Sequence, residues 1–224
     1  MKKQIILIMT DTTRKDMLGC YGNPKMITPN LDRLSAEGIR YENAYTCQPV
    51  CGPARSAIFT GTFPHTNGEV TNCVAMGDNI KTVGQRLTDN GIHCGYIGKW
   101  HLASNRLPGI GLHCESTAIP KNKQGEYQYF RGADVLEFTS HGYDGYVFDG
   151  DGNKIDFKGY RADCINDFAL EFLDKRDKDK PFFMFVSQLE PHHQNDHHTY
   201  EGYKPTVEKY KDYPLPDDLT FLKG

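Results

Sequence analysis

The chain has 224 residues and a formal net charge of -3, with 26 Lys and Arg against 29 Asp and Glu. No block of basic residues forms an electrostatic footprint for nucleic acid, and the apolar run Ile5–Met9 is too short to span a bilayer. The seven scattered cysteines indicate reduced thiols, and no pair has the C-x2-C spacing of a structural zinc site. We therefore expect a cytoplasmic protein with no nucleic-acid or membrane partner.

The first half of the chain alternates short apolar runs with helical patterns. The expected elements are a strand over 4–9, a helix over 28–38, a strand over 39–45, a helix over 82–91 and a strand over 92–97. The first of these strands is apolar at successive positions, which predicts burial on both faces, as in a parallel sheet. Thr28 and Pro29 are suited to the N-cap and first position of a helix, and Thr82 caps the next one.

Residues 103–160 have no clear period and are rich in Gly, Asp, Tyr and Asn. We expect an irregular excursion with a hairpin near residues 149–153. This stretch superficially resembles a calcium-binding loop, but Lys154 stands where that loop needs glycine and Tyr160 where it needs glutamate. The sequence therefore favours a turn.

Regular patterns return in the last third of the chain. A helix is predicted over 161–175, with an apolar face made of Ile165, Phe168, Ala169 and Phe172. A strongly buried strand follows over 182–186, and the chain becomes polar and proline-punctuated after residue 200. We expect an α/β domain over 1–200 and a polar tail over 201–224.

This alternation predicts an α/β fold with a mainly parallel sheet flanked by helices. Polar side chains follow three of the predicted strands: Asp11 the first, Lys99 and His101 the 92–97 strand, and His192 the last. Ligands of open α/β sheets bind beyond the carboxyl ends of the strands. We therefore expect these side chains to lie together at one edge of the sheet.

The stretch TCQPVCGPARSAIFTGTFPH, residues 46–65, places Cys51, Pro53 and Arg55 close together. Pro53 suits the first position of a helix, where free N–H groups and the helix dipole would favour an anion and a lowered thiol pKa at Cys51. Arg55 adds a planar cation suited to phosphate or sulfate oxygens. The alternative is a buried thiol beside a proline turn, with Arg55 solvated. The four-residue spacing excludes the tyrosine phosphatase loop, which needs six.

The segment Pro49–Gly61 (PVCGPARSAIFTG) resembles the type I sulfatase signature, C-x-P-x-R followed by two apolar residues and T-G. Gly95–His101 (GYIGKWH) resembles that family's second signature. Asp11, the Thr28–Asp32 helix start and Pro191–His192 occur in the order usual for the family. The resemblance implies an alkaline phosphatase-like α/β fold and a sulfuric ester hydrolase acting on a sulfated small molecule or saccharide.

The resemblance extends from about residue 4 to about residue 195 and implies a modified nucleophile. A separate formylglycine-generating enzyme would convert Cys51 to formylglycine, whose hydrated aldehyde attacks sulfur. Asp11 would be a hard oxygen ligand of a divalent cation that also binds the diol derived from Cys51; this cation is usually Ca²⁺, with Mg²⁺ as the alternative. Without the resemblance, Asp11 could be a simple N-cap, but its place directly after a buried strand favours a metal ligand.

The resemblance also implies catalytic roles for four further side chains. Arg55 would hold the diol, and Lys99 with His192 would neutralise sulfate oxygens or protonate the leaving group. His101 would take the proton that triggers elimination. Without the resemblance, Lys99 would read as a surface charge and both histidines as ordinary polar residues.

Two features depart from the family pattern. Thr12 stands where many members have a second metal-binding aspartate. Some sulfatases, and the related phosphonate and phosphodiester hydrolases, also lack this second acid, so a phosphorus ester is the alternative substrate. Members are also considerably longer, and their second half supplies further metal ligands. We therefore expect the N-terminal part of a sulfatase, or a truncated relative. A silent anion-binding fragment is the alternative of another class, and exposed apolar surface would favour self-association.

Overall fold

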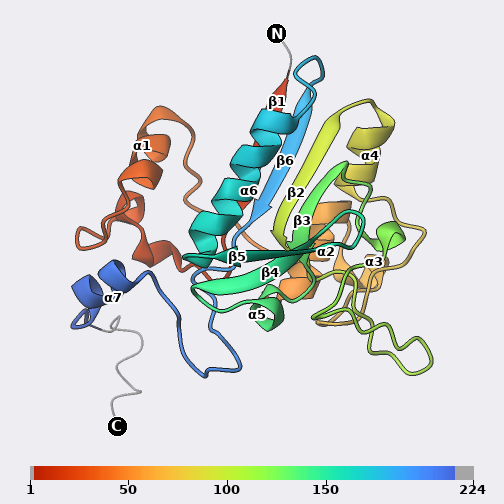
Figure 1. Cartoon of the computed structure of the whole chain (residues 1–224). Coiled ribbons are helices and arrows are strands. Elements are labelled where there is room, and N and C mark those ends of the chain that lie inside the picture. The colour runs from red at the N-terminus through yellow and green to blue at the C-terminus, as the bar shows by residue number, and fades with distance from the viewer. Residues whose placement is uncertain (1–2, 215–224) are drawn as a thin grey trace.

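The computed structural model describes residues 3–214, which fold around a six-stranded mixed sheet (Figure 1). The strands are β1 (Gln4–Met9), β2 (His93–Lys99), β3 (Tyr129–Ala133), β4 (Asp144–Asp149), β5 (Lys154–Lys158) and β6 (Phe182–Ser187). Their order is β1-β6-β2-β3-β4-β5. The first four of these run parallel, and β4 and β5 are added as an antiparallel hairpin. The predicted α/β fold with a mainly parallel sheet is confirmed.

Helices lie on both faces of this sheet. They are α1 (Pro29–Glu37), α2 (Cys51–Thr60), α3 (Pro64–Asn67), α4 (Val83–Asp89), α5 (Leu136–Thr139), α6 (Arg161–Lys175) and α7 (Lys204–Tyr210), with short 3-10 turns η1 (Lys15–Met17), η2 (Gly19–Tyr21) and η3 (Lys121–Lys123). The helices predicted over 28–38, 82–91 and 161–175 correspond to α1, α4 and α6. Thr82 caps α4 through a reciprocal pair of hydrogen bonds with Gln85, a capping box that the sequence carries locally.

The strand β6 supplies side chains to two cores because successive side chains of a strand point to opposite faces. Phe183 and Phe185 pack with Phe59 of α2 on one face. Met184 packs with Phe172 of α6 on the other face. The six residues of β6 are all buried, as the sequence predicted for 182–186. The sheet is therefore enclosed between α6 and the α2 and α4 side (Figure 1).

The strand β1 forms where it was predicted, but it is not buried on both faces. Ile5, Ile6 and Ile8 have 52%, 47% and 66% of their surface exposed. β1 lies at the edge of the described sheet and pairs with β6 alone. An apolar run has the same composition in a central strand and in an edge strand, so strand order rather than sequence decided its burial.

Two further predictions in the first half are wrong. Residues 39–45 contain no strand and pair with none of the described strands. Ile39 and Tyr45 are 83% and 91% exposed. Helix α2 begins at Cys51 with Val50 as its N-cap, so Pro53 is its third residue and not its first. Proline is tolerated there because N–H groups of the first turn have no partner within the helix.

Residues 103–160 hold more regular structure than was predicted. The hairpin is confirmed as β4–β5, and Asp149 Oδ1 accepts hydrogen bonds from the backbone N–H groups of Asp151 and Asn153 in its turn. The segment also contains β3, which extends the parallel sheet. Gly132 permits that pairing, because a Cβ there would lie 2.7 Å from the carbonyl oxygen of Gly98. This strand was not predicted because its five residues show no alternation of apolar and polar side chains.

The predicted tail over 201–224 is described as far as residue 214 and contains α7. Tyr210 accepts a hydrogen bond from the N–H of Ile27, and Tyr213 bonds to Asn23, so this end lies beside the segment before α1. Within residues 3–214, no helix combines the length and apolar character that crossing a bilayer requires.

Candidate active site

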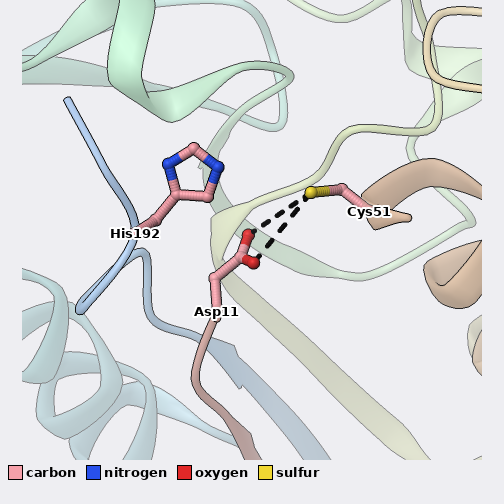
Figure 2. A group of neighbouring side chains, drawn as sticks. All are labelled: Asp11, Cys51 and His192. Atoms are coloured by element: carbon pink, nitrogen blue, oxygen red, sulfur yellow. Dashed lines mark hydrogen bonds between the residues drawn. The ribbon is translucent and has the colours of Figure 1, made fainter. Parts of the chain in front are cut away.

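Three chain segments meet at the carboxyl edge of the parallel strands. Asp11 follows β1, Cys51 begins α2 and His192 follows β6, and the potential ligand atoms of these three side chains all lie within 4.8 Å of one another. The Cys51 Sγ is 4.0 and 3.9 Å from the Asp11 Oδ1 and Oδ2 atoms. Figure 2 shows the Asp11 carboxylate lying between the other two side chains. The structure thus brings together residues that are up to 181 positions apart in the sequence.

Buried cations surround the Asp11 carboxylate. Its Oδ2 lies 3.2 Å from Lys99 Nζ and 3.3 Å from Arg55 Nη2, and neither cation has more than 3% of its side chain exposed. Lys99 also pairs with the buried Glu137 at 3.1 Å. Burial raises the pKa of Asp11, but Lys99, Arg55 and His192 outweigh it and leave that pKa below its usual value. Asp11 is therefore an ionised carboxylate at neutral pH.

The Arg55 guanidinium is fixed by the protein itself. Its Nη1 donates to the carbonyl oxygen of Lys99 at 2.8 Å and to Ser187 Oγ at 2.7 Å, and Nη2 donates to Asp11. These bonds connect α2 to the ends of β2 and β6. Arg55 is thus neither solvated nor free to move, and it holds the start of α2 against the sheet edge.

The thiol pKa of Cys51 is raised and not lowered, so that prediction is wrong. Burial is the main cause; the Asp11 carboxylate also raises this pKa, while Lys99 lowers it. The position at a helix N-terminus does not offset these effects. Cys51 is therefore a neutral thiol at pH 7, and it is a poor nucleophile in that form.

Behind Cys51, the carboxyl group of Glu69 fills the space that a side chain at position 52 would need. A Cβ on Gly52 would lie 2.4 Å from Glu69 Oε1. Glu69 is 1% exposed, and burial, reinforced by the Asp134 charge, raises its pKa to about 9. Its Oε2 atom has no hydrogen-bond partner among the described residues. Glu69 is therefore protonated at neutral pH.

Replacing Glu69 with glutamine is expected to flatten the pH dependence of stability. The folded carboxyl titrates near pH 9 and the unfolded one near 4.5, so the folded state holds the extra proton between these values. The free energy of unfolding should therefore fall as pH rises through this window, by up to roughly 1.4 kcal/mol per pH unit. Urea unfolding between pH 5 and 8 measures this slope. Glu208→Gln, at an exposed position, is the control, and equal slopes in Glu69→Gln and the parent would contradict the assignment.

His101 lies at the end of a strained connection after β2. Its φ is 56°, in the left-handed region, and its backbone N–H donates to the carbonyl oxygen of Asp134 at 2.7 Å. The Asp134 side chain accepts from the N–H groups of the next three residues, Leu102, Ala103 and Ser104. Asp134 therefore shapes the loop that follows the GKWH motif.

The His101 ring is buried and neutral. Burial and the nearby Lys99 charge lower its pKa to about 3. Its Nδ1 atom has no partner among residues 3–214, and its Nε2 lies 4.0 Å from the Cys73 sulfur. A neutral imidazole with an unpaired nitrogen can accept a proton.

His192 is positioned by a polar network beneath its loop. Its Nδ1 donates to the carbonyl oxygen of His193 at 2.6 Å, which leaves Nε2 available. The loop is held by Arg161, which is 1% exposed and bonds to Glu190 at 2.8 Å and to Gln194 at 3.1 Å. This network keeps His192 at the sheet edge.

The sequence did not reveal several residues that shape this site. They are Glu69, Asp134, Glu137, Arg161 and Ser187. None belongs to a motif, and each is a lone polar residue whose partner is distant in the chain. The one local signal is Ser187, a hydroxyl directly after five apolar residues of a buried strand.

The described residues do not complete a site for a hard cation. The group at the sheet edge offers a carboxylate, a thiol and an imidazole, and Lys99 and Arg55 already contact one oxygen of that carboxylate. Thr12 adds a hydroxyl that bonds to Asp11 Oδ1 at 3.1 Å. Ca²⁺ takes six to eight oxygens. Residues 3–214 alone therefore do not fit Ca²⁺, although Asp11 is suited to be one of its ligands.

The fold and this site identify the class of protein to which the chain belongs. The Sulfatase family model matches residues 3–217, and the chain belongs to the sulfatase family. It is 41% identical over 201 residues to the uncharacterized sulfatase YidJ of Escherichia coli strain K12, an alignment that covers 86% of this chain and 39% of the relative. An N-acetylglucosamine-6-O-sulfatase of Bacteroides thetaiotaomicron is 36% identical over 191 residues, with 85% and 31% covered.

Solved structures give the same result. The structure of BT4656 in complex with its substrate D-glucosamine-2-N,6-O-disulfate has a TM-score of 0.79 and 31% identity, covering 98% of this chain and 40% of that one. The putative sulfatase YidJ of Bacteroides fragilis also has a TM-score of 0.79, at 25% identity, covering 95% and 48%. The chain thus spans less than half the length of each of these four proteins.

Proposed function

We propose that this protein hydrolyses a sulfate monoester on a saccharide. The observation that carries the proposal is the Cys51 sulfur 3.9 Å from an ionised Asp11, in a cluster with the buried cations Lys99 and Arg55. Two similar proteins support the substrate class: one is named for N-acetylglucosamine 6-O-sulfate ester cleavage, and the other binds a sulfated glucosamine as its substrate.

The nucleophile in this proposal is formylglycine made from Cys51 by a maturating enzyme. The raised thiol pKa supports it, because a neutral thiol beside a carboxylate is a poor nucleophile toward a sulfate ester. When hydrated, the formyl group supplies one oxygen that attacks sulfur and becomes sulfated. Loss of the proton from the second oxygen then re-forms the aldehyde and breaks the carbon–oxygen bond to the sulfated oxygen, which releases sulfate. Cys51 is partly exposed and stands at the first position of α2, so it lies within reach of a modifying enzyme.

The protein's own residues then handle charge and protons. Lys99 is a rigid buried cation that holds the Asp11 carboxylate in place and attracts sulfate oxygens. Nε2 of His192 would donate a proton to the leaving oxygen when the ring is an imidazolium, because the neutral ring with its proton on Nδ1 has only a lone pair at Nε2. His101 would accept the proton whose removal releases sulfate through its unpaired nitrogen, and its pKa of about 3 makes it a weak base for that step. Arg55 fixes the position of α2, and with it the nucleophile.

A divalent cation belongs to the proposal as well. Ca²⁺ is the first candidate and Mg²⁺ the second, with Asp11 as an oxygen ligand and the Cys51-derived diol as another. Because the described residues do not complete the coordination shell, no catalytic step is derived through the cation. Its role would be to polarise the oxygens of the diol and of the ester.

A mass spectrum of the tryptic peptide of residues 41–55 tests the nucleophile. This peptide contains both Cys47 and Cys51, so the exposed Cys47 serves as an internal control. We expect one alkylated cysteine and one residue lighter than cysteine by two hydrogens and the difference between sulfur and oxygen, located by fragmentation at position 51. Two alkylated cysteines, from a host that contains the maturating enzyme, would overturn the proposal.

The same preparation distinguishes the second candidate substrate. The neutral Thr12 next to Asp11 favours a phosphonate monoester or phosphodiester as the alternative. Hydrolysis rates are to be compared on an aryl sulfate and the matched aryl phosphonate. Faster cleavage of the sulfate supports a sulfatase, and faster cleavage of the phosphonate supports the alternative with the same machinery.

A further inference from the structure

A second group of ligating side chains lies outside the candidate active site. His141 follows α5, and Asp196 and His197 belong to the loop after β6. Their potential ligand atoms all lie within 4.8 Å of one another. Their side chains are 42%, 49% and 45% exposed, so an ion in solution has direct access to them. Neither the sulfatase signatures nor the proposed chemistry uses these three residues.

Both imidazoles of this group contact carboxylates. His197 Nδ1 bonds to Glu201 Oε1, so Nδ1 carries the proton and Nε2 keeps its lone pair. His141 Nε2 lies 2.8 Å from Asp196 Oδ2, while its Nδ1 is 3.9 Å from Asp144 Oδ1. Glu201 thus lies behind His197 in the way usual around protein-bound zinc, where a carboxylate fixes the tautomer and raises the basicity of the ligand. Asp196 is itself a candidate ligand and does not serve as such a support for His141.

The two rings are stacked and nearly parallel, with centroids 4.1 Å apart and an interplanar angle of 7°. In-plane lone pairs of parallel rings do not converge on one point, so one ring has to turn for both to bind the same ion. Each side chain is almost half exposed, and such a rotamer change costs little at the surface. A turn of one ring is therefore enough for both imidazoles to reach the same ion.

We propose that His141, Asp196 and His197 form a binding site for a transition-metal ion of the Zn²⁺ class. Two imidazoles and a carboxylate suit Zn²⁺, Co²⁺ and Ni²⁺, whereas Ca²⁺ and Mg²⁺ prefer sites made of oxygens alone. Water completes the tetrahedron, because the group faces solvent. This site is separate from the hard-cation site expected at Asp11, and the two differ in the metal they select.

The position of the group gives such an ion a mechanical role. His141 is four residues after Glu137, the buried partner of Lys99, and Asp196 is four residues after His192. Gln194, fully buried, already connects the two segments by donating to the carbonyl oxygens of Glu137 and Ser140. An ion bound to His141 and His197 connects the same two segments at the surface. It therefore restrains the movement of the loop that carries His192.

Metal titration of the full chain tests the site. The protein is stripped with a chelator and titrated with Zn²⁺ against a chromophoric competitor, in the parent and in a Cys51→Ala background that removes the thiol at the other site. We expect one Zn²⁺ per chain in both. His141→Gln and His197→Gln should each weaken binding at least about tenfold, since loss of even a supporting residue of a metal site costs that much. His198→Asn is the matched control, because asparagine tolerates the φ of 52° there.

Two further measurements make the outcome decisive. Co²⁺ should give d–d absorption without a thiolate charge-transfer band, in the parent and in the Cys51→Ala background alike. Zn²⁺ should raise the melting temperature of the parent and of His198→Asn, and not that of His141→Gln. The proposal is overturned if Zn²⁺ does not bind, if the two glutamine variants bind as tightly as the parent, or if the Co²⁺ spectrum shows thiolate ligation.

Discussion

Replacing Cys51 with alanine is expected to reduce sulfate ester hydrolysis to the background rate, a loss on the order of 10³-fold or more. Cys51 lies 3.9 Å from Asp11 and is the one side chain in this cluster from which the proposed nucleophile can be made. Lys99 and Arg55 carry the positive charge that attracts a sulfate group, but neither they nor Asp11 is proposed to form the covalent intermediate. Initial rates on an aryl sulfate, measured after co-expression with a maturating enzyme, check this result.

Cys47→Ala is the matched control for this prediction. Cys47 lies four residues earlier in the same segment and is exposed, so its removal should leave the rate unchanged. Urea unfolding of both variants should give midpoints close to that of the parent, which separates lost chemistry from lost folding. Sulfatase activity retained in Cys51→Ala would show that another group is the nucleophile.

Replacing Lys99 with methionine is expected to lower the free energy of unfolding by about 3–5 kcal/mol. The Lys99 side chain is fully buried and contacts two carboxylates, Asp11 at 3.2 Å and Glu137 at 3.1 Å. Methionine has a similar volume but no charge, so it leaves Glu137 buried without its cation and Asp11 with Arg55 alone. Urea unfolding at pH 7 measures the loss.

Lys81→Met provides the comparison at the surface. Lys81 pairs with Asp89 at 2.6 Å, a shorter distance than either Lys99 contact, yet the two side chains are 59% and 45% exposed. Water screens such a pair, and its loss should cost less than about 1 kcal/mol. Equal destabilisation by the two substitutions would show that burial does not govern the Lys99 contacts.

Elements with local signals could be predicted from the sequence. Helix α4 begins at a capping box whose two members are three residues apart, and β6 is a run of apolar residues long enough for a buried strand. The α6 face of Ile165, Ala169 and Phe172 repeats with helical spacing and is buried as expected. Propensity, capping and periodicity act over a few residues, so they can be recognised in the sequence.

Strand order could not be predicted from local patterns. Residues 4–9 and 182–187 are both apolar, yet β1 is an edge strand and β6 is central. β3 has five residues and depends on Gly132, whose lack of a side chain allows close pairing with β2. Whether a segment is central, at the edge or unpaired depends on its neighbours in space, as the exposed residues 39–45 also show.

By itself, the sequence determined the family, the α/β class and which polar side chains follow the strand ends, because signatures and periodicities are local. The tertiary structure alone decided the ionisation of those side chains. Cys51 has a raised thiol pKa because folding buries it beside Asp11, 40 residues away, and Asp11 has a lowered pKa because Lys99 and Arg55 lie against it. The charge state of a buried group depends on desolvation and on nearby charges, which exist only once distant segments have come together.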